Sequence, residues 1–346
     1  MSIFESHNRG TNGHYCGYIL RVMLEDKIFN IATHHDFENT ALEVFQYQFD
    51  HISIYREFCE RLKVNPKSVK KIEDIPFLPI EFFKTHAIIS SEKNTQTQFI
   101  SSGTTGSVTS KHQVADLSIY EKSFLEGFKQ FYGQPSQFTI LALLPSYLER
   151  GDSSLVHMVD RLIKESNHSD SGFYLDEIDS LVSKMLDLEL QNKKVLLIGV
   201  SYALLDLIEA HTFQLKNTIV METGGMKGRR PEMIKEALHT ALKKGFGVET
   251  IHSEYGMTEL LSQAYSEGQG KFRCPPWMRV LSRDPEDPLT LVSGKTGGVN
   301  VIDLANLYSC SFIATQDLAK VSTDGSFEIL GRFDTSDIRG CNLMVL

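Results

Sequence analysis

A segment rich in glycine and hydroxyl side chains, near the end of the first third of the chain, has the composition of an anion-binding loop. Its sequence is ISSGTTGSVTSKH, residues Ile100–His112. Backbone N–H groups and hydroxyls can surround phosphate oxygens, and the ammonium of Lys111 can neutralise phosphate charge. The segment does not fit the GxxxxGK[ST] pattern of nucleoside triphosphatases, because the fifth residue after Gly103 is Val108 and Lys111 follows Ser110. On composition alone, phosphate binding and an ordinary polar surface loop are equal alternatives.

A second segment, HSEYGMTELLSQAYS, places an aromatic, a hydroxyl and a carboxylate in succession after a strand-like run. Tyr255 can stack on a nucleobase, Thr258 can bond a phosphate oxygen, and Glu259 can hold Mg²⁺, a cation that prefers oxygen ligands. Taken alone, the segment fits the start of a capped helix equally well.

A third segment, IATQDLAKVSTDGSFEILGRFDTSDIRGCNLM, carries Asp317 and Arg332 on either side of a predicted hairpin. The hairpin would bring the two side chains together, where they can meet the two hydroxyls of a ribose. The alternative is a pair of surface charges at strand ends.

Around these segments the hydrophobic pattern predicts an α/β sheet with helical cover. Short apolar runs, FTILALLP and KVLLIGV, are typical of buried strands. NTIVMETGG predicts a strand that ends in a glycine turn, and GVETIHSEYG predicts the strand that leads into Tyr255. Helices are expected at 153–165, at 175–190 and in PEMIKEALHTALKKG, which would end at Gly245. The turn-rich sequence from Trp277 onward indicates a β-rich part near the C-terminus.

The N-terminal part has its own pattern. Apolar residues recur every three to four positions from Glu38 to Leu62, which predicts one long amphipathic helix. The segment DIPFLPIEFFKTH contains two prolines and is expected to be an extended connector into the glycine loop. We expect residues 1–27 to be a tail outside the fold, with organised structure from Ile28 onward.

The composition and net charge of the chain argue against some classes of function. The chain has 346 residues, a formal net charge of −9 and a pI near 5.8, which argues against a nucleic-acid-binding surface as its main feature. Five cysteines are scattered without a CxxC pair, which predicts neither a disulfide framework nor a zinc ribbon. We interpret them as thiols in a reducing cytoplasm. No apolar run reaches the ~20 residues of a membrane span.

Taken together and in this order, the three segments resemble the adenylate-forming superfamily of acyl and aryl synthetases and ligases. A narrower resemblance, to the acyl-protein synthetase family that activates fatty acids in bacterial luciferase systems, covers nearly the whole chain from Ile28. It is carried by IPFLPIEFFK, LPSYLERGDSSLVHMV, LLIGVSYALLDL, METGGMKGRRPEM, HSEYGMTELLSQAYS, CPPWMRV and GRFDTSDIRGCNLM. The fold it implies is the large N-terminal domain of an adenylate-forming enzyme, with mixed sheets covered by helices, over residues 28–346.

The resemblance implies ATP and Mg²⁺ as cofactors and a role for each motif residue. Glu259 would bind Mg²⁺, and Thr258 would contact the α-phosphate. The residues implied around the β- and γ-phosphates are Ser101, Ser102, Gly103, Thr104, Thr105, Gly106 and Lys111. The residues implied at the adenine and the ribose are Gly224, Gly225, Tyr255, Gly256, Asp317 and Arg332.

The chain departs from the larger superfamily at its C-terminal end. The superfamily continues past its GRxD motif with a mobile domain that carries a catalytic lysine, whereas this sequence stops twelve residues after Asp334, so we expect that domain to be absent. His112, Lys111 or a partner's side chain are then the candidates to neutralise the α-phosphate. In acyl-protein synthetases a cysteine near the C-terminus accepts the acyl group, which makes Cys341 the expected acceptor; the alternative is a small buried residue.

Three functions follow from this resemblance. The first is ATP-dependent activation of a fatty acid and transfer to Cys341, then onward to an acyl-reductase or another acceptor protein. The second is ligation of an aryl or short-chain acid to coenzyme A. The third is a non-catalytic nucleotide-binding scaffold for an acyl-reductase complex. The apolar stretches around Leu155–Met158 and Tyr202–Leu207 are candidates for an acyl tunnel, although helical apolar stripes are usually core.

Overall fold

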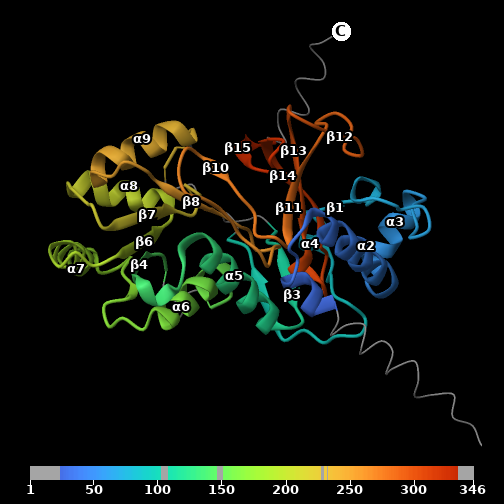
Figure 1. The fold of residues 1–346 in the computed structure, drawn as a ribbon, viewed down its shortest axis with the longest axis horizontal. Helices are drawn as coiled ribbons and strands as arrows, with labels where there is room; N and C mark the ends of the chain where they lie inside the picture. The colour runs from blue at the N-terminus through green and yellow to red at the C-terminus, as the bar shows by residue number, and fades with distance from the viewer. Residues whose placement is uncertain (1–23, 103–107, 146–150, 227–229, 232, 334–346) are drawn as a thin grey trace, which may run out of the picture.

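The computed structural model describes residues 24–102, 108–145, 151–226, 230–231 and 233–333 (Figure 1). Leu24 and Ile28 are already part of the hydrophobic core, at 1% and 0% exposure. The folded part therefore includes residues before the boundary at 28 that was expected from the sequence.

A largely parallel sheet forms one half of the described chain. Its strand order is β5-β4-β6-β7-β8-β9, with β9 antiparallel to β8 and the other neighbours parallel. The strands are β4 (Thr139–Leu143), β5 (Gly172–Phe173), β6 (Val195–Gly199), β7 (Thr218–Glu222), β8 (His252–Tyr255) and β9 (Ala264–Ser266). Every residue of β4 and β6 is buried, as expected of strands that are covered on both faces.

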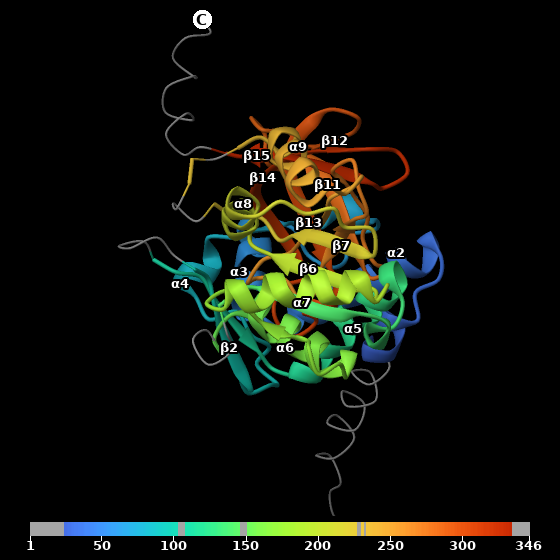
Figure 2. The same cartoon turned by 90° about the vertical axis from the view of Figure 1, so that its left-hand side faces the viewer.

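Helices cover both faces of this sheet. They are α5 (Leu117–Tyr132), α6 (Ser154–Ser166), α7 (Ile178–Leu190), α8 (Ser201–Ala210) and α9 (Lys235–Phe246). Helices α8 and α9 lie on one face, and α5 and α6 lie on the other (Figure 1). Figure 2 shows the same layers from the side, with α8 and α9 above β6 and β7. The expected strands and helices of this half are confirmed, apart from the bounds of α9.

A mainly antiparallel sheet forms the other half, as the turn-rich C-terminal sequence predicted. Its path is β10-β15-β14-β13-β11-β12, and β1 pairs with β14 in parallel. The strands are β1 (Leu78–Pro79), β10 (Lys271–Phe272), β11 (Met278–Arg283), β12 (Leu291–Val292), β13 (Thr296–Asp303), β14 (Phe312–Val321) and β15 (Phe327–Arg332). A separate hairpin of β2 (Thr97–Ile100) and β3 (Lys111–Val114) flanks the glycine loop.

The prediction of one helix over Glu38–Leu62 is wrong, because the structure has two. Helix α2 (His34–His51) begins at a capping box of Thr33 and Asp36, and α3 (Ser53–Arg61) follows it. Between them Ile52 has an extended backbone, φ −114° and ψ 98°, and its side chain is buried. The apolar spacing continues through Ile52, so the sequence pattern did not reveal the break.

The end of helix α9 also differs from the prediction. Gly245 lies inside the helix, where an added Cβ would come within 2.4 Å of Ile208 Cβ on α8. Gly247 is the capping residue, with the left-handed φ of 66°. The first glycine allows two helices to pack closely, and the second ends the helix.

The segment expected as an extended connector is tied to the antiparallel sheet. Leu78 and Pro79 pair with Ile313 and Ala314 of β14, and the Ile80 amide donates to the Ala314 carbonyl at 3.0 Å. A brief 3-10 turn, η1 (Ile72–Asp74), precedes β1, and a short helix, α4 (Phe82–Thr85), follows it. The sequence did not predict this pairing, which joins residues more than 200 positions apart.

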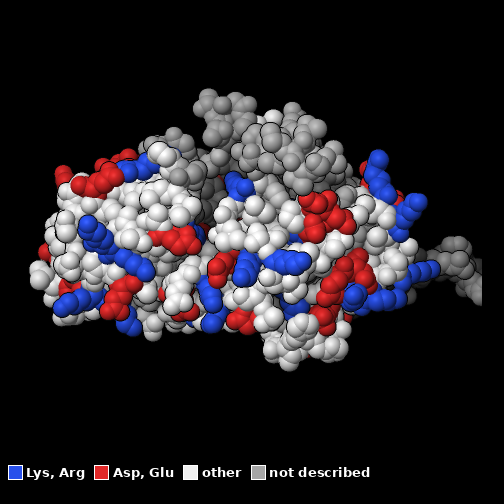
Figure 3. Space-filling view, turned by 90° about the horizontal axis from the view of Figure 1, so that it is seen from above, with Lys and Arg blue, Asp and Glu red and all other residues white. Residues whose placement is uncertain are grey.

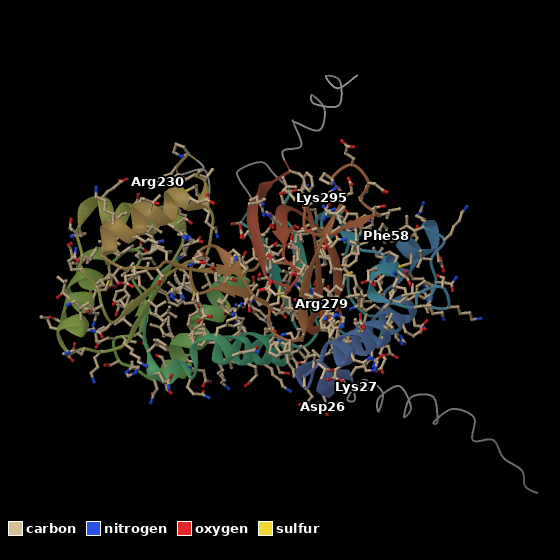
Figure 4. All side chains as sticks on the ribbon, turned by 45° about the horizontal axis from the view of Figure 1, so that its top comes forward. Asp26, Lys27, Phe58, Arg230, Arg279 and Lys295 are labelled. Atoms are coloured by element: carbon tan, nitrogen blue, oxygen red, sulfur yellow. The ribbon has the colours of Figure 1, made fainter. Side chains whose placement is uncertain are left out.

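The N-terminal helices pack on the same sheet. Arg279 of β11 (labelled in Figure 4) places its guanidinium 4.1 Å from the ring centroid of Phe37 on α2. On the face seen in Figure 3, Lys and Arg side chains are interspersed with Asp and Glu. In the part of the chain that the structure describes, no helix combines the length and apolar character needed to cross a bilayer.

Candidate active site

A cavity of about 420 Å³ lies where the three sequence motifs meet. Its lining includes residues that the sequence had assigned to ATP: Ser101, Ser102, Thr258, Glu259, Asp317 and Arg332. These side chains come from the end of β2, the segment after β8, and the hairpin of β14 and β15. Of the expected phosphate and ribose residues that the structure describes, all except Lys111 therefore line one cavity.

The third motif forms the hairpin that its sequence predicted. Asp317 on β14 is directly opposite Arg332 on β15, and Arg332 Nε donates to Asp317 Oδ1 at 2.9 Å. The Tyr255 hydroxyl donates to the other carboxylate oxygen at 2.7 Å. Burial and the neighbouring Asp317 carboxylate raise the pKa of Tyr255, so its hydroxyl stays protonated and remains a donor. This buried contact joins the second motif to the third.

Glu259, which the sequence predicted as the Mg²⁺ ligand, is one of the carboxylates that line this cavity. Its side chain is 6% exposed, and burial raises its pKa, whereas a hydrogen bond from Ser110 and the charges of Arg332 and Lys84 lower it. Within the described ranges there is no group of three or more His, Cys, Asp or Glu side chains that could hold a metal. One buried carboxylate beside hydroxyls suits Mg²⁺, which usually binds through one or two carboxylates together with substrate phosphates.

His112 is not a cation for the α-phosphate. The side chain is fully buried, and burial lowers its pKa to about 4, so the imidazole is neutral near pH 7. Its Nδ1–H donates to the Thr258 carbonyl at 2.8 Å, and its ring lies edge-on to Phe83 at 5.5 Å. His112 thus positions the Thr258–Glu259 backbone and supplies no charge to a phosphate.

The two lysines near the loop differ in their placement. Lys111 is exposed on β3, opposite Ile100 of β2, and does not belong to the cavity lining found among the described residues. Lys84 of α4 does line that cavity. Sequence reasoning missed Lys84, because the pairing of β1 with β14 that brings it there has no local signal.

The glycine turn after β7 has the predicted shape. Gly224 and Gly225 have φ of 73° and 87°, a conformation that favours glycine. The buried carboxylate of Glu222 accepts the Gly224 N–H at 2.8 Å and also accepts Lys235 Nζ at 2.9 Å. Burial alone would raise the pKa of Glu222, but hydrogen bonds from His239 and the other partners and the charge of Lys235 lower it to about 2. An ionised Glu222 therefore holds the turn, a role that the sequence did not reveal.

A second cavity, of about 160 Å³, adjoins the first along Ser102, Met257 and Thr258. Leu155, Val156 and Met158 of α6 form part of its wall, so this apolar stretch lines a cavity as well as belonging to the core. The Tyr202–Leu207 stretch lies in α8, where Tyr202, Leu204 and Leu207 are buried in the core.

The second cavity also has a polar side that the sequence did not predict. Glu254 and Gln263 line it, and Gln263 Oε1 has no hydrogen-bond partner among the described residues. Burial, together with the charge of Glu222, raises the pKa of Glu254 to about 8. A protonated Glu254 is expected at neutral pH. The signal available in the sequence was the alternation of β8, which directs Glu254 to the face opposite Ser253 and Tyr255.

Five of the assigned residues lie outside the described residues: Gly103, Thr104, Thr105, Gly106 and Cys341. The two ends of the glycine loop are nevertheless placed. The Ser101 amide donates to the Ser110 carbonyl at 3.0 Å, and the Ser110 amide donates to Ser101 Oγ at 2.9 Å. The loop thus begins and ends at the wall of the larger cavity. Cys59, Cys274 and Cys310, the cysteines that the described ranges contain, are free thiols.

Comparisons with known proteins identify the family of this chain. Residues 32–346 match the family described as "Acyl-protein synthetase, LuxE". A long-chain-fatty-acid–luciferin-component ligase from Vibrio harveyi is 24% identical over 323 residues, which is 86% of this chain and 84% of that protein. A protein of the same name from Photorhabdus luminescens is 36% identical over 67 residues, which is 19% of this chain and 57% of that protein.

Two solved structures have a similar fold. A 2-hydroxyisobutyryl-CoA ligase, in complex with 2-HIB-AMP and CoA, aligns with a TM-score of 0.63 at 13% identity, over 88% of this chain and 70% of the ligase chain. ATP-bound MatB from Rhodopseudomonas palustris aligns with a TM-score of 0.51 at 19% identity, over 69% of this chain. The chain spans about half of MatB, 48%. The expected fold of an adenylate-forming enzyme is confirmed.

Proposed function

Because the chain belongs to the acyl-protein synthetase (LuxE) family, we propose that it activates a fatty acid with ATP as an acyl-adenylate and passes the acyl group to a protein thiol. The observation that supports this most strongly is the single cavity that joins the ends of the glycine loop to Thr258, Glu259, Asp317 and Arg332. Such a cavity offers hydroxyl donors and cations for a triphosphate, and a carboxylate for Mg²⁺.

In the first step, a carboxylate oxygen of the acid attacks the α-phosphorus of ATP. A phosphorus–oxygen bond forms, the bond to the β-phosphate oxygen breaks, and pyrophosphate leaves with its negative charge. Two anions must approach each other, so the site must screen charge before the reaction. Mg²⁺ held at Glu259 would supply part of this screening.

The residues of this chain orient the reactants. Tyr255 and Arg332 hold the Asp317 carboxylate beside the ribose position, and His112 fixes the carbonyl of Thr258. Glu222 holds the Gly224 turn on the adenine side. We assign the adjoining 160 Å³ cavity to the carboxyl end of the acid, because it meets the larger cavity at Thr258.

In the second step, a thiolate attacks the carbonyl carbon of the acyl-adenylate. A carbon–sulfur bond forms, the carbon–oxygen bond to the phosphate breaks, and AMP leaves. We assign this thiol to Cys341, from the resemblance of the C-terminal sequence to the family. A thiol on a reductase or another acceptor protein would then take the acyl group from it.

Exchange of labelled pyrophosphate into ATP tests the first step. We expect exchange that depends on a fatty acid, measured across chain lengths from short to long. ATP binding without exchange for any carboxylic acid would refute acid activation and favour a non-catalytic scaffold. Release of acyl-CoA on addition of coenzyme A, with no labelled protein, would instead favour the coenzyme A ligase.

A further inference from the structure

Lys84 is a cation in the larger cavity that none of the assignments above uses. It lies on α4, and its exposed side chain lines the cavity together with Ser101, Ser110 and Glu259. Burial raises the pKa of the Glu259 carboxyl, and the charge of the Lys84 ammonium is a smaller effect that acts in the opposite direction. Lys84 therefore shares one cavity with the proposed metal ligand.

Helix α4 is held in place from two sides. Phe83, the residue before Lys84, is 1% exposed and packs edge-on against His112, which in turn bonds to the Thr258 carbonyl. On the other side, the Ile80 amide donates to β14, and Gln316 of β14 donates to the Glu81 carboxylate. The segment that carries Lys84 is thus fixed to both the second and the third motif.

Among the described residues that line the cavity, one cation is available to bind an anion. Among the described lining residues, the carboxylates are Glu259 and Asp317 and the cations are Lys84 and Arg332. Arg332 is engaged by Asp317 through Nε at 2.9 Å. In the described part of the chain, no ion pair is formed by Lys84. A triphosphate entering this cavity would meet Lys84 as the cation not already committed to a carboxylate.

We propose that Lys84 binds the phosphate oxygens of ATP in this cavity, as the lysine of the phosphate site in place of Lys111, which is not among the described residues that line the cavity. A lysine ammonium is a compact point charge with three donors, which suits phosphate oxygens. The inference rests on the proposed nucleotide site, but not on the identity of the acid or the acyl acceptor.

The test compares MgATP and adenosine binding by calorimetry in Lys84→Met, Lys84→Arg and the wild type. A charge-assisted hydrogen bond corresponds to about a 10- to 100-fold change in affinity. We expect Lys84→Met to weaken MgATP binding by about that factor and to leave adenosine binding within about twofold, because adenosine has no phosphate. Lys84→Arg should recover most of the loss. The exposed Lys67→Met, which lies outside the cavity lining, serves as the matched control.

Equal losses of affinity for MgATP and adenosine would show that Lys84 has a structural role and would overturn the proposal. Unchanged MgATP binding by Lys84→Met would also overturn it, and so would the absence of ATP binding by the wild type. Failure of the proposed reaction gives a different result. If Lys84→Met selectively loses MgATP while no acid supports pyrophosphate exchange, then the phosphate role stands and acid activation does not. Thermal melting without nucleotide should be the same for all four proteins, since the Lys84 and Lys67 side chains are exposed.

Discussion

The buried carboxyl of Glu254 should make the stability of this protein fall as the pH rises, and Glu254→Gln should remove that loss. Glu254 is 8% exposed at the wall of the smaller cavity. Burial is the main cause that raises its pKa, the charge of Glu222 raises it further, and Lys235 lowers it, giving about 8 instead of 4.5. The folded state therefore holds a proton that the unfolded chain releases above its ordinary pKa.

The linkage between proton binding and folding gives the direction and the size of the change in the free energy of unfolding with pH. With a raised folded-state pKa, the stabilisation is complete below about pH 4.5 and is lost as the pH rises through about 8. Each pH unit in this interval lowers the free energy of unfolding by about 1.4 kcal/mol, which amounts to roughly 5 kcal/mol across the whole interval. Glutamine has nearly the same shape and cannot ionise, so the variant should gain relative stability steadily from pH 5 to pH 8.

Urea denaturation of the wild type and Glu254→Gln at pH 5, 6, 7, 8 and 9 measures this difference. Other titrating groups are common to both proteins, so their effects cancel in the comparison. One of these groups is Asp303, since burial raises its pKa to about 6. Glu267→Gln, which removes an exposed carboxyl, is the control and should follow the wild type. Parallel pH profiles for the wild type and Glu254→Gln would refute the assignment of a protonated Glu254.

Two further substitutions test how the site is held together. Glu222→Gln should raise the KM for ATP more than it changes kcat. A neutral amide loses the charge-assisted hydrogen bonds from Lys235 and from the Gly224 amide, each worth about 1.5–3 kcal/mol. An unchanged KM in steady-state assays would contradict this expectation. His112→Phe should destabilise the protein by about 1–3 kcal/mol, because the Thr258 carbonyl loses its donor. Since His112 is neutral, the pH profile of kcat should keep its shape in this variant, and a lost ionisation near pH 6–7 would show that His112 acts as a charge.

Much of the fold could be predicted because its strands are covered on both faces. FTILALLP and KVLLIGV are continuous apolar runs, and the structure buries every residue of β4 and β6. The hairpin that pairs Asp317 with Arg332 was also predictable, since the turn between the two strands is local in sequence. The helix break at Ile52 was not, because a buried apolar residue fits the helical spacing whether or not the chain bends there.

The parts of the site that the sequence did not reveal depend on contacts between distant segments. Lys84 enters the cavity because β1 pairs with a strand more than 200 residues later. Glu222 and Glu254 could be identified as functional candidates only from their burial and, for Glu222, from its hydrogen bond with the Gly224 amide. His112 had the right residue type for charge neutralisation, but burial removes its charge.

In the proposed reaction, a carboxylate oxygen of the substrate attacks the α-phosphorus of ATP in this cavity. A fatty acid labelled with oxygen-18 in its carboxylate, incubated with ATP and the protein through one complete turnover, tests this directly by mass spectrometry of the products. We expect one labelled oxygen in AMP and none in pyrophosphate. Label in inorganic phosphate, with ADP as the nucleotide product, would contradict it.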